Sequence, residues 1–204
     1  MNDPAAVMTV VGIAGSLRRR SFNRALLRAA VGLAPEGMRI DVFDLAPVPL
    51  YNADLDENYG GGPYPNAVAE LRARVEAADA LLMVTPEYNW GPSGVTKNVV
   101  DWLSRPAGSS PLANKPIALA GASPGPAGTG RAQLQLRQHL LSTQSYVLQQ
   151  PIVQLGGAAG LFDDNLELVD EAARGLVRRQ LVALVDWTAR MKAPSLAEAQ
   201  IRLG

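Results

Sequence analysis

Cysteine is absent from this sequence of 204 residues, and histidine occurs once, as His139. Without thiols there is no disulfide framework, no cysteine-ligated zinc or iron–sulfur site and no thiol catalysis. His139 falls inside a predicted helix, where we interpret it as a surface or packing residue. No carboxylate pair or histidine cluster suited to a metal accompanies it, and we expect no metal site. Any redox chemistry must therefore come from a bound cofactor.

An excess of charge is also missing, because 19 Lys and Arg residues balance 19 Asp and Glu residues. Such a chain has no bulk field for nucleic acid or an anionic membrane, so we expect neither as a partner. The apolar run at residues 7–14 is too short for a signal or a membrane span. We therefore expect a small-molecule partner and a cytoplasmic location.

The length suits one well-buried domain, and a content of 48% hydrophobic and 19% charged residues is ordinary for a globular protein. We expect a single domain over residues 1–204. Its core should run from about residue 7 to residue 190, with a C-terminal tail over 192–204.

Apolar and β-branched runs alternate with amphipathic segments along the chain. The runs predict strands at residues 7–14, 38–45, 80–84, 116–120 and 146–155. Apolar spacings of three and four predict helices at residues 21–34, 67–78, 95–104, 131–141 and 165–191. Because parallel neighbours need crossovers long enough to hold a helix, this order predicts an α/β fold with a doubly wound, five-stranded parallel sheet and helices on both faces.

The segment 46–65 is rich in Pro, Gly, Asn and Asp and is long for a connection in a compact domain. Such loops usually serve a site or an interface. We interpret it as a lid or a dimer contact, with a mobile crossover as the alternative.

In an open α/β sheet, ligands bind beyond the carboxyl ends of the strands, where the strand order reverses. Three loops qualify, at residues 15–23, 85–94 and 121–130. The third has four glycines among its ten residues, so its backbone can approach a ligand closely.

The first loop combines hydroxyls at Ser16 and Ser21, the amide of Asn23 and three arginines at 18–20, at the predicted start of a helix. Unpaired N–H groups and the helix dipole favour an anion there, so we expect a phosphate. The alternative is that Ser21 caps the helix and the arginines are solvated. The spacing is that of neither a P-loop nor a G-x-G-x-x-G motif.

The second loop carries Tyr88, Asn89 and Trp90 between two prolines. Aromatic cover with backbone donors and acceptors at a strand end suits a flat heterocycle. The alternative is a turn whose Tyr88 and Trp90 are tucked into the core.

Two motifs here are similar to those of a known family. Gly-Ser-Leu-Arg-x-x-Ser-x-Asn begins at Gly15, and Pro-Glu-Tyr-Asn begins at Pro86, followed from Gly94 by Gly-x-x-Lys-Asn-x-x-Asp-Trp-x-Ser-Arg. Together they resemble the NADPH-dependent FMN reductase family, which includes quinone, azo-dye and chromate reductases. The resemblance covers roughly residues 7–190.

This resemblance implies a flavodoxin-like fold that binds FMN. The first motif would bind the FMN phosphate, the second would lie along the flavin ring, and the third loop would close over it. The implied FMN-binding residues are Ser16, Leu17, Arg18, Ser21, Phe22, Asn23, Pro86, Glu87, Tyr88, Asn89 and Ser123.

The implied activity is ping-pong transfer of electrons from NADPH or NADH to a small acceptor such as a quinone, azo dye, chromate or flavin. The flavin carries the chemistry, so no catalytic side chain is expected, and we place Tyr88 and Trp90 where the acceptor stacks. The alternative is an FMN-binding electron carrier without its own substrate. Family members are homodimers or homotetramers, with the helix that holds Lys97, Asn98 and Asp101 near the subunit contact.

The chain also departs from the family pattern. Gly91-Pro92-Ser93-Gly94 precedes the Lys-Asn helix where many relatives have Pro-Gly, and Gly128-Thr129-Gly130 replaces two adjacent glycines. These differences leave the acceptor open.

Overall fold

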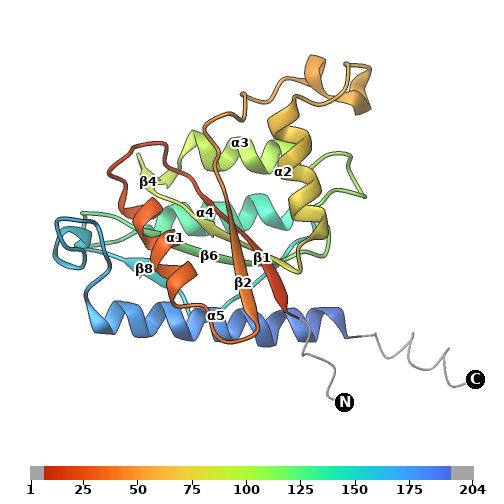
Figure 1. Ribbon diagram of the computed structural model, residues 1–204. Helices are drawn as coiled ribbons and strands as arrows, with labels where there is room; N and C mark the ends of the chain where they lie inside the picture. Colours follow the sequence, from red (N-terminus) through yellow and green to blue (C-terminus); the bar gives the residue numbers. More distant parts are fainter. Residues whose placement is uncertain (1–6, 194–204) are drawn as a thin grey trace, which may run out of the picture.

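The computed structural model describes residues 7–193 (Figure 1). Its strands are β1 (Met8–Ala14), β2 (Met38–Phe43), β3 (Ala80–Val84), β4 (Glu87–Tyr88), β5 (Gly91–Pro92), β6 (Pro116–Ala122), β7 (Tyr146–Val147) and β8 (Val153–Leu155). Its α-helices are α1 (Phe22–Gly32), α2 (Asn66–Ala77), α3 (Gly94–Leu103), α4 (Gly130–Leu141) and α5 (Glu171–Lys192). Short 3-10 helices are η1 (Ala53–Leu55), η2 (Glu57–Tyr59) and η3 (Ala158–Gly160).

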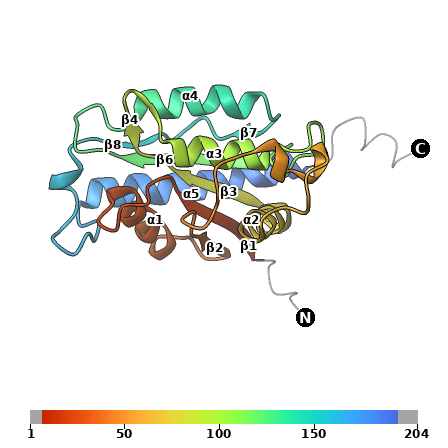
Figure 2. The same cartoon turned by 90° about the horizontal axis from the view of Figure 1, so that it is seen from above.

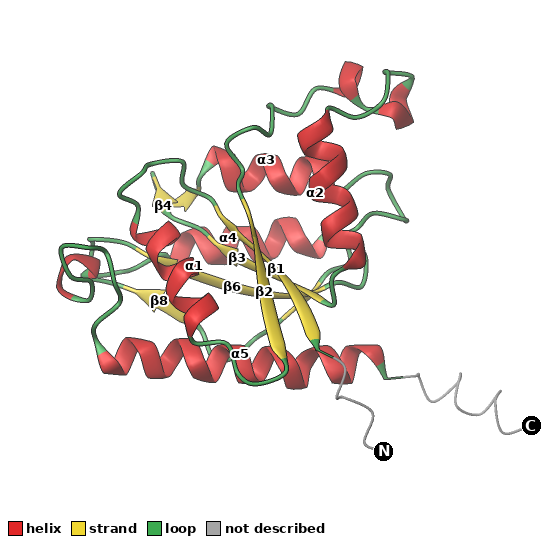
Figure 3. Ribbon diagram, in the orientation of Figure 1, coloured by secondary structure: helices red, strands yellow, loops and turns green. Residues whose placement is uncertain are grey.

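The main sheet is parallel and has the order β2-β1-β3-β6-β7, with β8 also paired to β6. This is the flavodoxin-like order, in which the chain winds outward in both directions from β1 and β3. The predicted fold class is therefore confirmed. Because all these strands run the same way, the loops after β1, β3 and β6 lie at one end of the sheet (Figure 3).

Helices cover both faces of the sheet, and each face has its own hydrophobic core. Buried residues of α1 and α5 pack on one face, whereas those of α2, α3 and α4 pack on the other (Figures 1 and 2). Within β3, Leu82 belongs to the first core and its neighbour Leu81 to the second. Successive strand residues point to opposite faces, which explains why β3 is apolar throughout.

The fifth predicted strand, residues 146–155, is divided into β7 and β8. Both segments pair with β6, but residues 148–152 between them are not strand. Pro151 lies in this gap and has no N–H group to donate to the ladder, which accounts for an interruption that the apolar pattern does not reveal.

The last helix begins at Glu171 rather than at residue 165, as the apolar spacing predicts. Before it, the Asp163 carboxylate accepts the N–H groups of Asn165 and Glu167 in a local turn. The Asp170 carboxylate then accepts the N–H of Ala173 and caps the helix. Aspartate favours such turns and caps over helix interiors, and this preference sets the true start. All but the first two residues of the tail expected over 192–204 lie outside the described residues.

The long loop 46–65 is fastened to α3. The carbonyl of Pro49 accepts hydrogen bonds of 2.8 Å from both the Asn98 amide and the Trp102 indole, and the Asn98 carbonyl oxygen accepts the N–H of Tyr51 at 2.7 Å. Asn98, implied by the resemblance to lie near a subunit contact, is thus used inside the chain.

The same loop contains η1 and η2, arranged around the buried carboxylate of Asp56. Burial alone would raise the pKa of Asp56, but hydrogen bonds from Asn58, Tyr51 and Tyr64 outweigh it and hold the pKa below its ordinary value. The Arg105 guanidinium stacks 5.5 Å from the ring centre of Tyr51. The loop is therefore an ordered cover for α3. No described helix carries an apolar stretch long enough to span a membrane.

Candidate functional site

The three loops at the carboxyl end of the sheet meet in one open cleft of about 250 Å³. Eight of the residues predicted from the sequence line it, namely Arg18, Ser21, Phe22, Asn23, Pro86, Glu87, Tyr88 and Ser123. Ala122 and Pro124 also line it, and they flank Ser123 in the third loop. Four other predicted residues, Ser16, Leu17, Asn89 and Trp90, are not among the lining residues. The 46–65 loop contributes none, which gives no support to its interpretation as a lid.

The first loop presents unused hydrogen-bond donors. Among the described residues, no protein acceptor is found for the main-chain N–H groups of Ser16, Leu17 and Arg18. The Ser21 hydroxyl accepts the N–H groups of Asn23 and Arg24 and so caps α1, as the alternative interpretation of this residue predicts. The Arg18 side chain is exposed at the cleft. Free N–H groups and a cation at a capped helix start form a favourable anion site.

Asn23 is 4% exposed and binds the main chain of Ala122 in both directions. Its amide nitrogen donates to the Ala122 carbonyl, and its amide oxygen accepts the Ala122 N–H, each at 2.9 Å. Ala122 lies beyond Ala120, the last β6 residue paired with β3. The Asn23 side chain thus extends the hydrogen bonding of β6 past the end of β3. The same two bonds join the first loop to the third.

A network of buried hydroxyls supports the cleft from below. Thr96 Oγ1 lies 2.9 Å from the hydroxyl oxygens of both Thr85 and Ser93, and Ser93 donates to the carbonyl of Gly15 at 2.5 Å. A Cβ atom on Gly15 would stand 1.8 Å from Thr96 Oγ1, so only glycine fits there. Sequence reasoning missed this network, because isolated hydroxyl residues give no pattern that shows which of them meet.

The second loop is a β-hairpin that projects from the sheet. β4 and β5 pair antiparallel, and the two turn residues Asn89 and Trp90 have φ angles of 50° and 69°. A two-residue turn with both φ angles positive matches the twist of a hairpin. Tyr88 is 53% exposed and Trp90 is 68% exposed. The alternative that both rings are tucked into the core is therefore wrong.

The Glu87 carboxylate binds the start of α4. One oxygen accepts the N–H groups of Arg131 at 2.9 Å and Ala132 at 3.1 Å, and the other pairs with the Arg131 guanidinium at 2.9 Å. The side chain is 9% exposed. Only the main chain of Glu87 is left to contact a molecule in the cleft.

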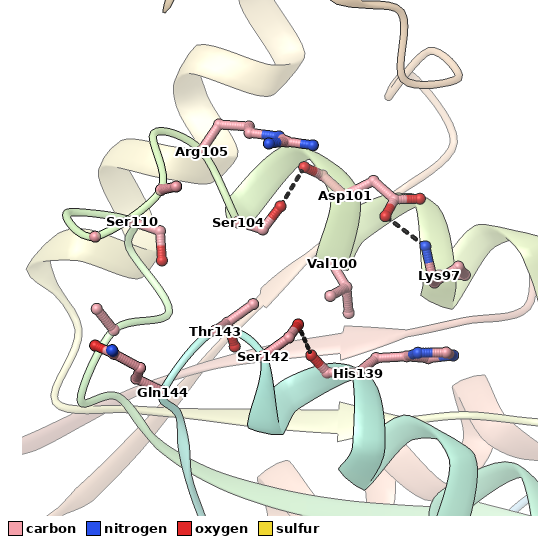
Figure 4. Close-up of a pocket in the computed structure, with 13 residues that line it drawn as sticks. Lys97, Val100, Asp101, Ser104, Arg105, Ser110, His139, Ser142, Thr143 and Gln144 are labelled. Carbon is pink, nitrogen blue, oxygen red and sulfur yellow. Dashed lines mark hydrogen bonds and ion pairs between the residues drawn. The ribbon is translucent and has the colours of Figure 1, made fainter.

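A second cavity, of about 360 Å³, lies between α3 and the C-terminal part of α4 and shares no residue with the cleft (Figure 4). His139 lines it, as do Lys97 and Asp101, which form an ion pair. Within residues 7–193, no group of three or more His, Asp or Glu side chains is arranged to hold a metal.

The sequence is similar to that of proteins with known activities. Residues 8–160 match the NADPH-dependent FMN reductase family. An NAD(P)H-dependent FMN reductase of Pseudomonas aeruginosa is 46% identical over 90% of this chain and 96% of its own. A quinone reductase of Pseudomonas putida is 38% identical over 81% of this chain and 87% of its own.

Among solved structures, the flavoenzyme NAD(P)H:(acceptor) oxidoreductase of Paracoccus denitrificans superposes with a TM-score of 0.80 and 31% identity, over 91% of this chain and 99% of that one. The agreement in sequence and in fold extends over nearly the whole length of the chain. The chain therefore belongs to the NADPH-dependent FMN reductase family.

Proposed function

We propose that the three-loop cleft holds FMN and that the chain uses it to pass electrons from NADPH or NADH to a small acceptor. The observation that carries this proposal is the meeting of the three loops in one cleft. The residues present fit the group. Free N–H groups and Arg18 suit a phosphate dianion, and Pro86 with the main chain of Glu87 offers a flat, partly apolar edge for a ring.

A bound FMN supplies the capacity to accept hydride from a nicotinamide and to release electrons singly or in pairs. The chain's own residues would bind the flavin and orient it. The Ser16, Leu17 and Arg18 N–H groups would hold the phosphate, Asn23 fixes the third loop, and Ser123 would stand against the ring. No side chain is required to move a proton.

The openness of the cleft favours a ping-pong sequence. At about 250 Å³ it is smaller than the roughly 300–1,000 Å³ of typical ligand clefts and cavities, so part of a bound flavin would extend into solvent. Tyr88 and Trp90 stand exposed on the hairpin. Nucleotide and acceptor would then use the same open ring face in turn, with these aromatic rings offering a stacking surface for a planar acceptor.

The acceptor class that we propose is a quinone. Relatives bear the name quinone reductase at 38% and 34% identity, and exposed aromatic side chains pair well with flat rings. A carrier that docks partner proteins would be expected to have a strongly acidic surface, whereas this chain has equal numbers of acidic and basic residues. That balance favours the enzyme over the carrier.

We also propose a homodimer or homotetramer. Leu134 and Leu141 lie two turns apart on α4 and are 62% and 78% exposed. The cavity between α3 and α4 borders the same helix through His139 and is also lined by the Lys97–Asp101 pair (Figure 4). A second copy of the chain would cover these leucines. Light scattering should give the mass of two or four chains, and a monomer would contradict the proposal.

The activity is tested by stopped-flow reduction of the FMN-loaded protein with NADPH, followed by steady-state assays with a quinone, an azo dye, chromate and free flavin. We expect rapid flavin bleaching by NADPH and parallel double-reciprocal plots with a quinone. Flavin that NADPH does not reduce, but that a protein donor does, would identify an electron carrier instead.

A further inference from the structure

Trp90 has a cation on one of its two faces. The guanidinium carbon of Arg131 lies 4.7 Å from the centre of the Trp90 ring, a distance at which the cation is attracted to the ring face. The Trp90 side chain is nevertheless 68% exposed. One face of the indole is thus covered by Arg131, which leaves the opposite face for any planar molecule that stacks on this residue.

Arg131 is itself held in place by Glu87. The guanidinium pairs with one Glu87 oxygen at 2.9 Å, while the other oxygen binds the first N–H groups of α4. Thr129, the residue at the N-cap position of α4, makes no side-chain capping bond. Glu87 therefore caps α4 from a distant loop, where its negative charge also complements the helix dipole.

A second tether joins the hairpin to α4. The Gln135 amide donates to the carbonyl of Trp90 at 3.0 Å. Gln135 follows Arg131 by one helical turn, so both side chains extend from the same face of α4. A Cβ on Gly91 would lie only 3.0 Å from the Gln135 side-chain oxygen, which shows how closely the turn sits on this helix. Gln135 thus fixes the main chain of Trp90, whereas Arg131 contacts its ring.

We propose that Arg131 is a positioning residue for the electron acceptor: it holds the Trp90 indole in one orientation, so that the uncovered face forms a platform beside the cleft for a planar acceptor. Glu87 lines the cleft and sets the position of Arg131, and so it aligns the platform with the cleft. This inference rests on the proposed function, because the platform has a role only if an acceptor is reduced in the neighbouring cleft. A small acceptor that does not stack would not depend on Arg131.

The test compares Arg131→Ala, Arg131→Lys, Trp90→Ala and the Arg131→Ala/Trp90→Ala double variant in the FMN-loaded protein. Arg179→Ala, an exposed arginine on α5, is the matched control. We expect Arg131→Ala to lower kcat/KM for a planar quinone by about two- to fivefold, the range of a lost cation–π contact at an exposed site. Chromate reduction and the NADPH half-reaction should change by less than about twofold. Arg131→Lys should recover part of the loss, and Arg131→Ala should have no further effect on the Trp90→Ala protein.

A readout independent of turnover is the collisional quenching of tryptophan fluorescence by acrylamide in the FMN-free protein. Subtraction of a Trp90→Phe reference isolates the Trp90 emission, which should be quenched more strongly in Arg131→Ala because the second ring face opens. Equal quenching with and without Arg131 would overturn the contact. A uniform loss over quinone, chromate and the NADPH half-reaction would overturn the positioning role, as would a full Arg131→Ala effect on top of Trp90→Ala. Failure of the proposed function would be seen separately, as wild-type flavin that NADPH does not reduce.

Discussion

Replacing Asn23 by alanine separates a structural role from a direct role in cofactor binding. The resemblance to FMN reductases implies that Asn23 contacts FMN, yet both ends of its amide are engaged by the main chain of Ala122 at 2.9 Å. In Asn23→Ala, one buried N–H and one buried carbonyl of Ala122 lose their partner. The third loop then loses its connection to the first, whether or not FMN is present.

The size of the effect follows from those two groups. A buried polar group left without a partner costs about 1–3 kcal/mol. Ala122 lines the cleft, where water can take over part of the bonding, so the lower part of that range applies to each group. We therefore expect the free energy of unfolding of the FMN-free protein to fall by about 2–3 kcal/mol in total.

Arg18→Ala is the matched comparison, because Arg18 lies at the same cleft but its side chain is exposed. It should leave the stability of the FMN-free protein within about 0.5 kcal/mol and weaken FMN binding by about 1–3 kcal/mol, the cost of a lost charge-assisted bond. Urea unfolding without FMN and fluorescence titration with FMN measure the two quantities. The reasoning is refuted if Asn23→Ala keeps the wild-type unfolding midpoint and loses only FMN affinity. Unchanged FMN affinity in Arg18→Ala would place the phosphate elsewhere.

Three further outcomes are expected. Gly15→Ala places a methyl group 1.8 Å from Thr96 Oγ1 and should lower the free energy of unfolding by about 1–3 kcal/mol. Urea unfolding measures this change, and an unchanged midpoint would contradict the described packing. Burial alone would raise the pKa of Asp79, but hydrogen bonds, first that of Lys192, outweigh it and hold the pKa below its ordinary value. The stabilisation by Asp79 is therefore present above the ordinary pKa of about 3.9 and is lost as the pH falls through the lower folded-state value. In Asp79→Asn, the free energy of unfolding should fall less steeply with decreasing pH in this acid range. Equal pH dependence of the two proteins in denaturation experiments would refute this expectation. Trp90→Ala should lower kcat/KM for bulky quinones more than for chromate, whereas one common factor for all acceptors would make Trp90 a purely structural residue.

Much of the fold could be predicted from local patterns, because buried parallel strands and amphipathic helices have distinct periodicities. The predicted element bounds were wrong where a single residue changes the backbone hydrogen bonding of a segment whose apolar pattern suits a regular element. Pro151 interrupts an apolar run that reads as one strand, and Asp170 moves the start of α5 past a segment whose spacing suits a helix. Both are effects of backbone hydrogen bonding, to which hydrophobic periodicity is insensitive.

The candidate site could be located from the sequence but its internal bonding could not. Strand order brings the three loops together, and this follows from topology alone. The partners of Asn23 and Glu87 depend on groups 99 and 44 residues away in the chain, which no local motif specifies. The motifs therefore identified residues at the cleft, but they did not show that the side chains of Asn23 and Glu87 form hydrogen bonds within the protein.

We expect one FMN to bind in the three-loop cleft of each chain. Saturation of the purified protein with FMN, removal of the excess, denaturing release and chromatography of the released flavin measure both its identity and its amount. The wild type should release one FMN per chain, and Arg18→Ala should release much less at the same free FMN concentration. FAD as the released flavin, or no flavin bound by the wild type at micromolar FMN, would contradict this expectation.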